Sequence, residues 1–235
     1  MKIIGMIPAR LGSKRVKKKN LRLIDNKPLI SYVIEKAKAC NLLNDIYLNS
    51  DGIIFEEIAN RHNINFYHRN KNLASKHSTN DEFSLDFMNN IKGDILIQVL
   101  PTSPLITLIE ISNFVNEIIS KDYDTLISVE NKQIASVYKD KPINFDKFKK
   151  NPPSQTMEPI KVYASALMGW KYKSFINNMQ KYGSAYHGGD GKTGYFELKG
   201  LSTLDIDNEE DFKLVEKIIH SSKSNMCFEK KYYNN

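Results

Sequence analysis

The 235-residue sequence contains only two cysteines and no apolar run long enough to cross a bilayer, which takes about 20 consecutive apolar residues. The apolar start, residues 1–8, is shorter than a signal peptide and is not followed by a small-residue cleavage site. Cys40 and Cys227 lack the spacing of a metal site, and we interpret them as free thiols rather than as a disulfide. We therefore expect a cytoplasmic protein that does not interact with a membrane.

Arginine is also scarce, although the formal net charge is +7. The chain has 34 basic residues but only five arginines, all within the first 69 residues: Arg10, Arg15, Arg22, Arg61 and Arg69. Recognition of base edges and nucleic-acid phosphates favours the arginine fork, whereas scattered lysines are typical of a solvated surface. We therefore expect no nucleic-acid partner.

The first 130 residues alternate between short apolar runs and segments whose apolar residues have helical spacing. Strands are predicted at residues 2–7, 45–48, 64–68, 94–100 and 125–129. Helices are predicted between them, at residues 28–40, 53–61, 82–91 and 108–120. Strands and helices that alternate in this way form a parallel sheet covered by helices on both faces. The predicted fold class is α/β.

Beyond about residue 130 the pattern is less regular. Residues 144–159 are polar and contain two adjacent prolines, which indicates an excursion from the sheet. Two more strands are predicted at residues 162–170 and 194–198, and two more helices at residues 174–181 and 208–220, the last with Asn208 as its N-cap. We expect a single domain over residues 1–222, a flexible tail at 223–235 and a mobile, glycine-rich surface loop at 187–192.

A basic loop, residues 7–21, follows the first predicted strand. Ligands of open parallel sheets bind beyond the C-terminal ends of the strands, where this loop begins. Gly12 and Ser13 favour a tight turn with accessible N–H groups, and Arg10 and several lysines supply cationic donors, so the loop can hold a triphosphate. It has neither the P-loop nor the G-x-G-x-x-G pattern. The alternative is a solvated basic loop or a nuclear-localisation-like tract.

The same loop resembles the N-terminal signature of the acylneuraminate cytidylyltransferase family, I-P-A-R-x-G-S-K-x-x-x-x-K-N. The sequence matches it at nine positions: Ile7, Pro8, Ala9, Arg10, Gly12, Ser13, Lys14, Lys19 and Asn20. The related Kdo cytidylyltransferases share I-P-A-R-x-G-S but usually lack the K-N that follows. The resemblance implies that the CTP phosphates and ribose are bound by Arg10, Gly12, Ser13, Lys19 and Asn20.

Two further segments are similar to those of the family. Arg69, followed by residues 72–75, resembles its R-x-x-x-L-A-x segment, which implies that Arg69 binds the nucleotide. Ser78, Thr79 and Asn80 are candidates for binding the cytosine, although residues 78–81 could equally cap a helix. Residues 100–105 resemble its x-P-T-S-P-L turn. The predicted sugar-binding residues in and around these segments are Gln98, Thr102, Ser103 and Gln155.

Asp205 and Asp207 are separated by one residue, so on a strand both carboxylates point to one side. Mg²⁺ typically binds one or two carboxylates together with substrate phosphates. The alternative is that Asp207 caps the next helix while Asp205 lies on the surface. The family's D-I-D-x-x-x-D segment resembles residues 205–211, and the resemblance implies that the two aspartates hold magnesium. Arg10, Lys19 and Asp207 are then the predicted catalytic residues.

The sequence departs from the family pattern mainly on the sugar side. Leu100 stands where the family usually has Gln and Ile106 where it usually has Arg; its R-Q pair appears as residues 154–155, and its Y-x-x-N-G-A as residues 163–166 without the Asn. The nucleotide chemistry is therefore better supported than the identity of the sugar.

The resemblance implies a three-layer nucleotidyltransferase with a mostly parallel, Rossmann-like sheet, in which residues of about 140–185 project and form a homodimer. It also implies that CTP and an acidic 2-keto sugar react to give a CMP-sugar and pyrophosphate. Two alternatives stay open: a Kdo-type or other CTP-dependent transferase with a different acid or phosphorylated acceptor, and a non-catalytic nucleotide-binding protein.

Overall fold

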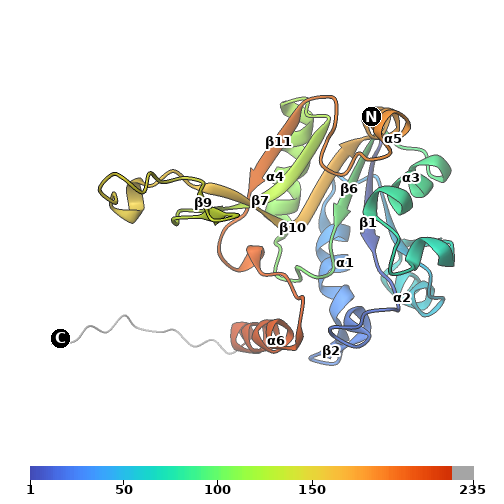
Figure 1. The fold of residues 1–235 in the computed structure, drawn as a ribbon. Coiled ribbons are helices and arrows are strands. Elements are labelled where there is room, and N and C mark those ends of the chain that lie inside the picture. The colour runs from blue at the N-terminus through green and yellow to red at the C-terminus, as the bar shows by residue number, and fades with distance from the viewer. Residues whose placement is uncertain (224–235) are drawn as a thin grey trace.

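The computed structural model describes residues 1–223, so residues 224–235, with Cys227 and nearly all of the predicted flexible tail, lie outside the described residues. A seven-stranded sheet runs through the centre in the order β11-β7-β10-β6-β1-β4-β5 (Figure 1). Only β10 is antiparallel to its neighbours. The seven strands are β1 (Ile3–Pro8), β4 (Asp45–Ser50), β5 (Asn65–His68), β6 (Ile95–Val99), β7 (Thr125–Lys132), β10 (Ile160–Lys171) and β11 (Thr193–Glu197).

Helices cover both faces of this sheet, as predicted. The helices of the described residues are α1 (Leu29–Ala39), α2 (Ile54–His62), α3 (Asn80–Asn90), α4 (Leu108–Ser120), α5 (Tyr172–Tyr182) and α6 (Glu209–Lys223). Side chains of β1 alternate between two cores because a strand has a side-chain period of two. Ile3 and Ile7 pack with α1, α2 and α4, whereas Ile4 and Met6 pack with α3 and α5. The fold is therefore the expected three-layer α/β arrangement.

Helix α6 belongs to a third, smaller core below the sheet (Figure 1). Its Phe212, Val215 and Ile219 pack with Val16, Ile24, Leu29 and Ile206. Asn208 caps the helix as predicted, since its Oδ1 accepts hydrogen bonds from the backbone N–H groups of Glu210 (2.8 Å) and Asp211 (3.0 Å). The third core therefore joins the segment after β1 to the segment that carries Asp205 and Asp207.

An arm projects from the sheet between β7 and β10 (Figure 1). It consists of residues 133–159 and contains the short strands β8 (Val137–Tyr138) and β9 (Lys141–Pro142). The predicted bounds, about 140–185, are wrong at the C-terminal end. Strand β10 pairs with both β6 and β7, and α5 packs on the sheet through the buried Phe175, so residues 160–182 belong to the body of the domain.

Strand β10 carries a bulge where it passes the C-terminal end of β6. Its register with β7 shifts between Tyr163 and Met168, and Ser165 within this stretch has a φ of 47°. A left-handed backbone costs an L-residue about 1–2 kcal/mol, so non-glycine residues rarely adopt it in a strand. The bulge therefore stores backbone strain at a defined position.

The first prediction concerns this strain. Ser165→Gly should raise the free energy of unfolding by about 0.5–1 kcal/mol, because glycine tolerates the positive φ and loses only part of that gain in backbone entropy. Ala164→Gly is the matched control and should lower stability, since Ala164 is buried and is outside the left-handed region. Urea unfolding measures both. A destabilised Ser165→Gly would show that the hydroxyl contributes more than the strain costs.

The second prediction concerns the third core. Phe212 is fully buried, with the Arg22 guanidinium 3.9 Å from its ring centroid. Phe212→Ala should destabilise the packing of α6 by about 3 kcal/mol and raise amide hydrogen exchange over residues 209–222 while β6 stays protected. Leu214→Ala, on the exposed side of the same helix, should change stability by less than about 0.5 kcal/mol. Similar losses in both variants would contradict the burial pattern.

Candidate functional site

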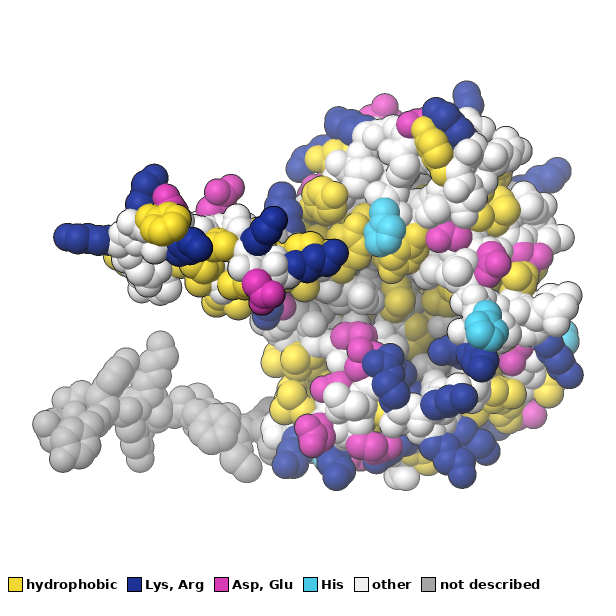
Figure 2. Space-filling model, viewed as in Figure 1, with side chains coloured by type: hydrophobic (Ala, Val, Ile, Leu, Met, Phe, Trp, Pro, Cys, Tyr) yellow, Lys and Arg dark blue, Asp and Glu magenta, His cyan; other side chains and the backbone are white. Residues whose placement is uncertain are grey.

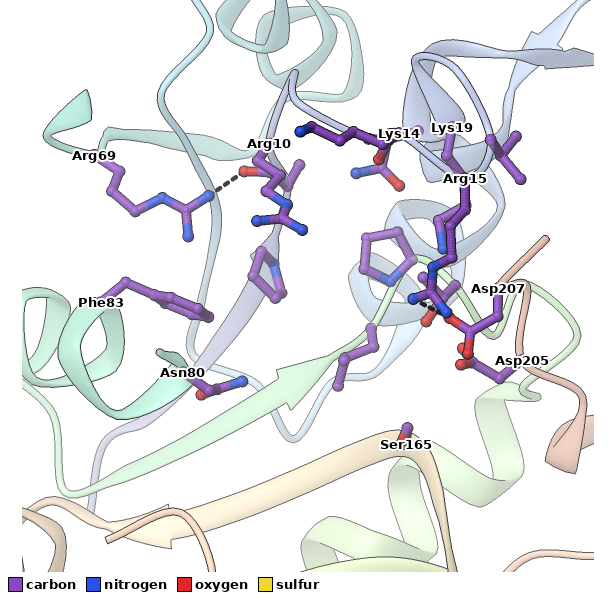
Figure 3. A pocket seen from close by; sticks show the side chains of 18 residues that line it. Arg10, Lys14, Arg15, Lys19, Arg69, Asn80, Phe83, Ser165, Asp205 and Asp207 are labelled. Carbon is purple, nitrogen blue, oxygen red and sulfur yellow. Dashed lines mark hydrogen bonds and ion pairs between the residues drawn. The ribbon is translucent and has the colours of Figure 1, made fainter. Parts of the chain in front are cut away.

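A cleft of about 360 Å³ opens at the C-terminal ends of the parallel strands (Figure 3). It brings together the loop after β1, the residue after β5, the start of α3, the turn after β6, the bulge of β10 and the segment before α6. The predicted residues that line it are Arg10, Ser13, Lys19, Asn20, Arg69, Asn80, Thr102, Asp205 and Asp207. Segments from both ends of the chain therefore meet at one site.

Lys19 joins the basic loop to the segment before α6. Lys18 adopts a left-handed conformation, with φ 50°, and Lys19 then begins a short 3-10 helix with its side chain buried. The Lys19 Nζ donates a hydrogen bond to the carbonyl oxygen of Ile206. Burial lowers the pKa of Lys19, while the negative charges of Asp205 and Asp207 oppose that shift. The ammonium is thus fixed between the loop and the two carboxylates.

Asp205 and Asp207 lie beside each other in the cleft (Figure 3). Their segment belongs to no helix or strand. The Ile206 N–H donates to the carbonyl oxygen of Thr102 (2.8 Å), and the Ile206 side chain packs in the third core. The two aspartates on either side of Ile206 therefore face the cleft. Asp207 is not the helix cap, because Asn208 has that role.

The environment of Asp205 fits a cation. Its Oδ1 is buried without a hydrogen-bond partner, and burial raises the pKa of the carboxyl against a lowering effect of the hydrogen bond with Thr102. Within residues 1–223, no group of three or more His, Cys, Asp or Glu side chains is arranged to hold a metal. A pair of carboxylates that lacks further protein ligands is what Mg²⁺ uses when phosphates complete its shell.

The opposite side of the cleft is formed by Arg69, Phe83 and Asn80 (Figure 3). The Arg69 guanidinium donates to the carbonyl oxygen of Ala9 and lies 4.6 Å from the Phe83 ring centroid. Burial lowers the pKa of Arg69 to about 10. Because this side pairs an aromatic face with fixed polar groups, it suits a flat heterocycle better than a phosphate.

Gln98 positions Asn80 rather than lining the cleft. Gln98 is fully buried; its amide donates to the Oδ1 of Asn80 (2.8 Å) and to Ser84 (2.8 Å), and its Oε1 accepts from the Nδ2 of Asn80 (2.9 Å). The cap of α3 is Thr79, in a capping box with Glu82. Of the residues considered in the sequence at the start of this helix, Thr79 therefore caps the helix and Asn80 lines the cleft.

Four other predicted residues do not line the cleft either. The Ser78 hydroxyl donates to the carbonyl oxygen of Asn72 (2.6 Å) and stabilises its own loop. Ser103 is buried in the turn after β6, and Gln155 lies on the arm. Gly12 does not line the cleft, although the next residue, Ser13, does. These positions follow from tertiary contacts that the motifs do not encode.

The cleft residues that were not predicted include Arg15, Phe83 and Ser165. Arg15 lies within the predicted loop but outside the family's fixed positions. Phe83 reads as an ordinary apolar residue of an amphipathic helix, and Ser165 as a small polar residue in a strand. Only the proximity of Arg15 to the matched positions could have indicated it.

The loop at residues 187–192 is tied to α5. The Asp190 carboxylate accepts hydrogen bonds from Lys181 (2.7 Å) and Tyr182 (2.9 Å). The Asn178 side-chain amide donates to the carbonyl oxygen of Asp190 and accepts from its backbone N–H. No residue of this loop lines the cleft. Its mobility stays a prediction.

Charge is unevenly distributed around the hollow near the centre of the face in Figure 2, where Lys and Arg side chains gather below the opening next to Asp and Glu side chains. The opening thus combines cationic groups for an anionic ligand with carboxylates for a cation.

No helix of residues 1–223 has the length and apolar character of a membrane span.

Comparisons with known proteins indicate the family of the chain. The chain matches the family model described as Cytidylyltransferase over residues 4–233. It is 28% identical to the N-acylneuraminate cytidylyltransferase of Escherichia coli O18:K1:H7 in an alignment of 232 positions that covers 91% of this chain and 51% of that protein. It is 38% identical to the pseudaminic acid cytidylyltransferase of Campylobacter jejuni serotype O:2 over 80 residues, 34% of each chain.

The chain spans about half the length of the curated relatives that it matches over most of its own sequence. In fold, it is similar to a solved structure of CMP:2-keto-3-deoxy-manno-octonic acid synthetase complexed with CTP, with a TM-score of 0.75 and 15% identity over 94% of this chain and 100% of that chain. The match to the family model covers almost the whole chain, and the chain therefore belongs to the cytidylyltransferase family, as its motifs predicted.

Proposed function

We propose that the protein transfers CMP from CTP to an acidic 2-keto sugar, giving a CMP-sugar and pyrophosphate, in the cytoplasm. The observation that carries the proposal is the meeting of Lys19, from the signature loop, with Asp205 and Asp207 in one cleft. The names of the E. coli and C. jejuni relatives support an acylneuraminate-like or pseudaminate-like acceptor. The Lys19–Asn20 pair favours such an acceptor over the Kdo-type alternative.

The cationic side of the cleft suits the triphosphate. Arg10, Lys14 and Lys19 present guanidinium and ammonium groups, and Ser13 of the same loop also lines the cleft. Charge-assisted hydrogen bonds from these groups would orient the α-phosphate and stabilise the charge that develops on it. Lys19 is the best placed of these groups, because its buried Nζ has little freedom to move.

Asp205 and Asp207 would hold Mg²⁺, which when bound neutralises phosphate charge. Their carboxylates need no further protein ligand, since phosphate oxygens and water would complete the shell. The acceptor hydroxyl forms the new bond to the α-phosphorus, the bond to pyrophosphate breaks, and the hydroxyl proton passes to solvent. Arg69, Phe83 and Asn80 would hold the cytosine on the far side.

The acceptor would meet a weakly polar wall. Of the segments where the sequence departs from the family, two contribute to the cleft lining, through Leu100 and through Ser165 in the β10 bulge. Ile106 is fully buried in the core beneath. A polar acceptor group left unpaired in a closed site costs about 1–3 kcal/mol. We therefore propose a deoxygenated nonulosonate rather than a fully hydroxylated one.

The arm would pair two copies of the chain. Its exposed apolar side chains are Ile134, Val137, Tyr138, Ile143 and Phe148, each more than half exposed. Apolar groups clustered on a projecting segment favour contact with another protein surface. In a homodimer they would be covered, and Gln155 on the same arm could approach the cleft of the second copy.

The third prediction tests nucleotide and acceptor together. Pyrophosphate release should be fastest with CTP among the four ribonucleoside triphosphates, and a dideoxy-diamino nonulosonate should give a higher kcat/KM than N-acetylneuraminic acid or Kdo. Each missing hydrogen bond at the acceptor wall predicts about a 5- to 150-fold penalty in kcat/KM for the more polar sugar. Equal rates with UTP or ATP would refute the nucleotide assignment.

Acceptor results separate the remaining alternatives. A highest kcat/KM for N-acetylneuraminic acid would refute the weakly polar wall but not the transferase. Reaction with only a small phosphorylated acceptor would replace the sugar-acid assignment. CTP binding without turnover on any acceptor would favour the non-catalytic alternative.

The fourth prediction concerns the carboxylates. Asp205→Asn and Asp207→Asn should each lower kcat at least 100-fold at limiting Mg²⁺, because each removes a charged ligand. Asp211→Asn is the matched control: Asp211 accepts from the backbone N–H groups of Asp207 (2.8 Å) and Asn208 (2.9 Å), a role that an amide oxygen can also fill. Steady-state kinetics against Mg²⁺ concentration checks all three. Near-normal turnover in either of the first two variants would exclude that residue as a ligand.

A further inference from the structure

Arg15 forms an ion pair with one of the two cleft aspartates. Its Nη2 lies 2.8 Å from the Oδ1 of Asp207, and both side chains line the cleft (Figure 3). Within the described part of the chain, no other ion pair reaches Asp205 or Asp207. A guanidinium thus lies against a carboxylate that the proposed function assigns to a metal ion.

Lys19 does not replace Arg15 in this contact. The Lys19 Nζ is committed to the carbonyl oxygen of Ile206, and Asp205 keeps an Oδ1 without a partner. The described structure therefore holds two neighbouring carboxylates of which one is compensated by an exposed arginine.

We propose that Arg15 is a built-in counter-ion of Asp207, which a divalent cation displaces when it binds. The proposal rests on the proposed magnesium site at Asp205 and Asp207. The Arg15 side chain is 70% exposed and that of Asp207 50%. Water and salt screen such a pair, so its loss costs little. A divalent cation held by Asp205 and Asp207 would be attracted by two negative charges, whereas the guanidinium contacts one carboxylate.

The displaced guanidinium stays close to the phosphates. Arg15 lies on the same loop as Arg10 and Lys14, and all three line the cleft. Its planar fork can bind a phosphate group through two parallel hydrogen bonds. Nucleotide binding would then hold Arg15 away from Asp207 and raise the affinity of the cation site, and by reciprocity the cation would strengthen nucleotide binding.

Direct metal binding tests the proposal without relying on turnover. Mn²⁺ serves as the probe, with binding to the full chain followed by electron paramagnetic resonance in the absence of nucleotide. Arg15→Gln should bind Mn²⁺ about 2- to 5-fold more tightly than the unaltered chain, in line with the strength of exposed ion pairs. Lys14→Gln is the matched control: it removes the same charge from the same loop, but no ion pair joins Lys14 to either aspartate in residues 1–223, so its effect should be clearly smaller.

A second measurement adds CTP. The gain in Mn²⁺ affinity on adding CTP should be smaller in Arg15→Gln than in the unaltered chain, and Arg15→Lys, which keeps the charge but lacks the fork, should lie between them. In the measurement without CTP, equal shifts of the Mn²⁺ affinity in Arg15→Gln and Lys14→Gln, or no shift in Arg15→Gln, would overturn the proposal while leaving the metal site intact. If the unaltered chain and all variants failed to bind Mn²⁺ with or without CTP, the metal site would fall and this proposal with it.

Discussion

The hydrogen bond from the Lys19 Nζ to the Ile206 carbonyl oxygen joins segments 187 positions apart. An ammonium group is costly to bury unless hydrogen bonds or opposite charges compensate it. Here the carbonyl compensates it directly and Asp205 and Asp207 act from nearby. To reach this position the chain adopts a left-handed conformation at Lys18. The contact thereby fixes the loop that would hold the triphosphate relative to the carboxylates that would hold the cation.

The third hydrophobic core supports that contact. Ile206 and Phe212 pack against Val16 and Ile24. The basic loop and the segment that carries the two aspartates therefore share one small core, which is separate from the cores on either face of the sheet. The Arg22 guanidinium, over the Phe212 ring and paired with Glu209, adds a further link. Because a small core buries little area, the geometry of the site depends on few side chains.

The cleft has two chemically different sides. Lys19 and the aspartates form one, and the stacked Arg69 and Phe83, with Asn80 held by the buried Gln98, form the other. Ser165, in a strained backbone conformation, lies on the strand that borders the cleft. Backbone strain at a cleft residue is typical of functional sites, where the surrounding structure holds a conformation that the residue alone would avoid. Here the pairing of β10 with β6 and β7 holds it.

The sequence by itself determined the α/β class, the six helices and the seven strands of the central sheet, the Asn208 cap, and the two motifs that carry Lys19 and the aspartates. These features depend on local periodicity and on fixed spacings within one segment. Tertiary structure decided the rest. Residues 160–182 return to the sheet because β10 finds two neighbours there, and Gln98 faces a buried network rather than the cleft. Phe83 and Ser165 reach the cleft, and Arg15 reaches Asp207, through contacts between segments far apart in the chain. No local pattern records such contacts, since they arise only when the ends of neighbouring strands meet at one edge of the sheet.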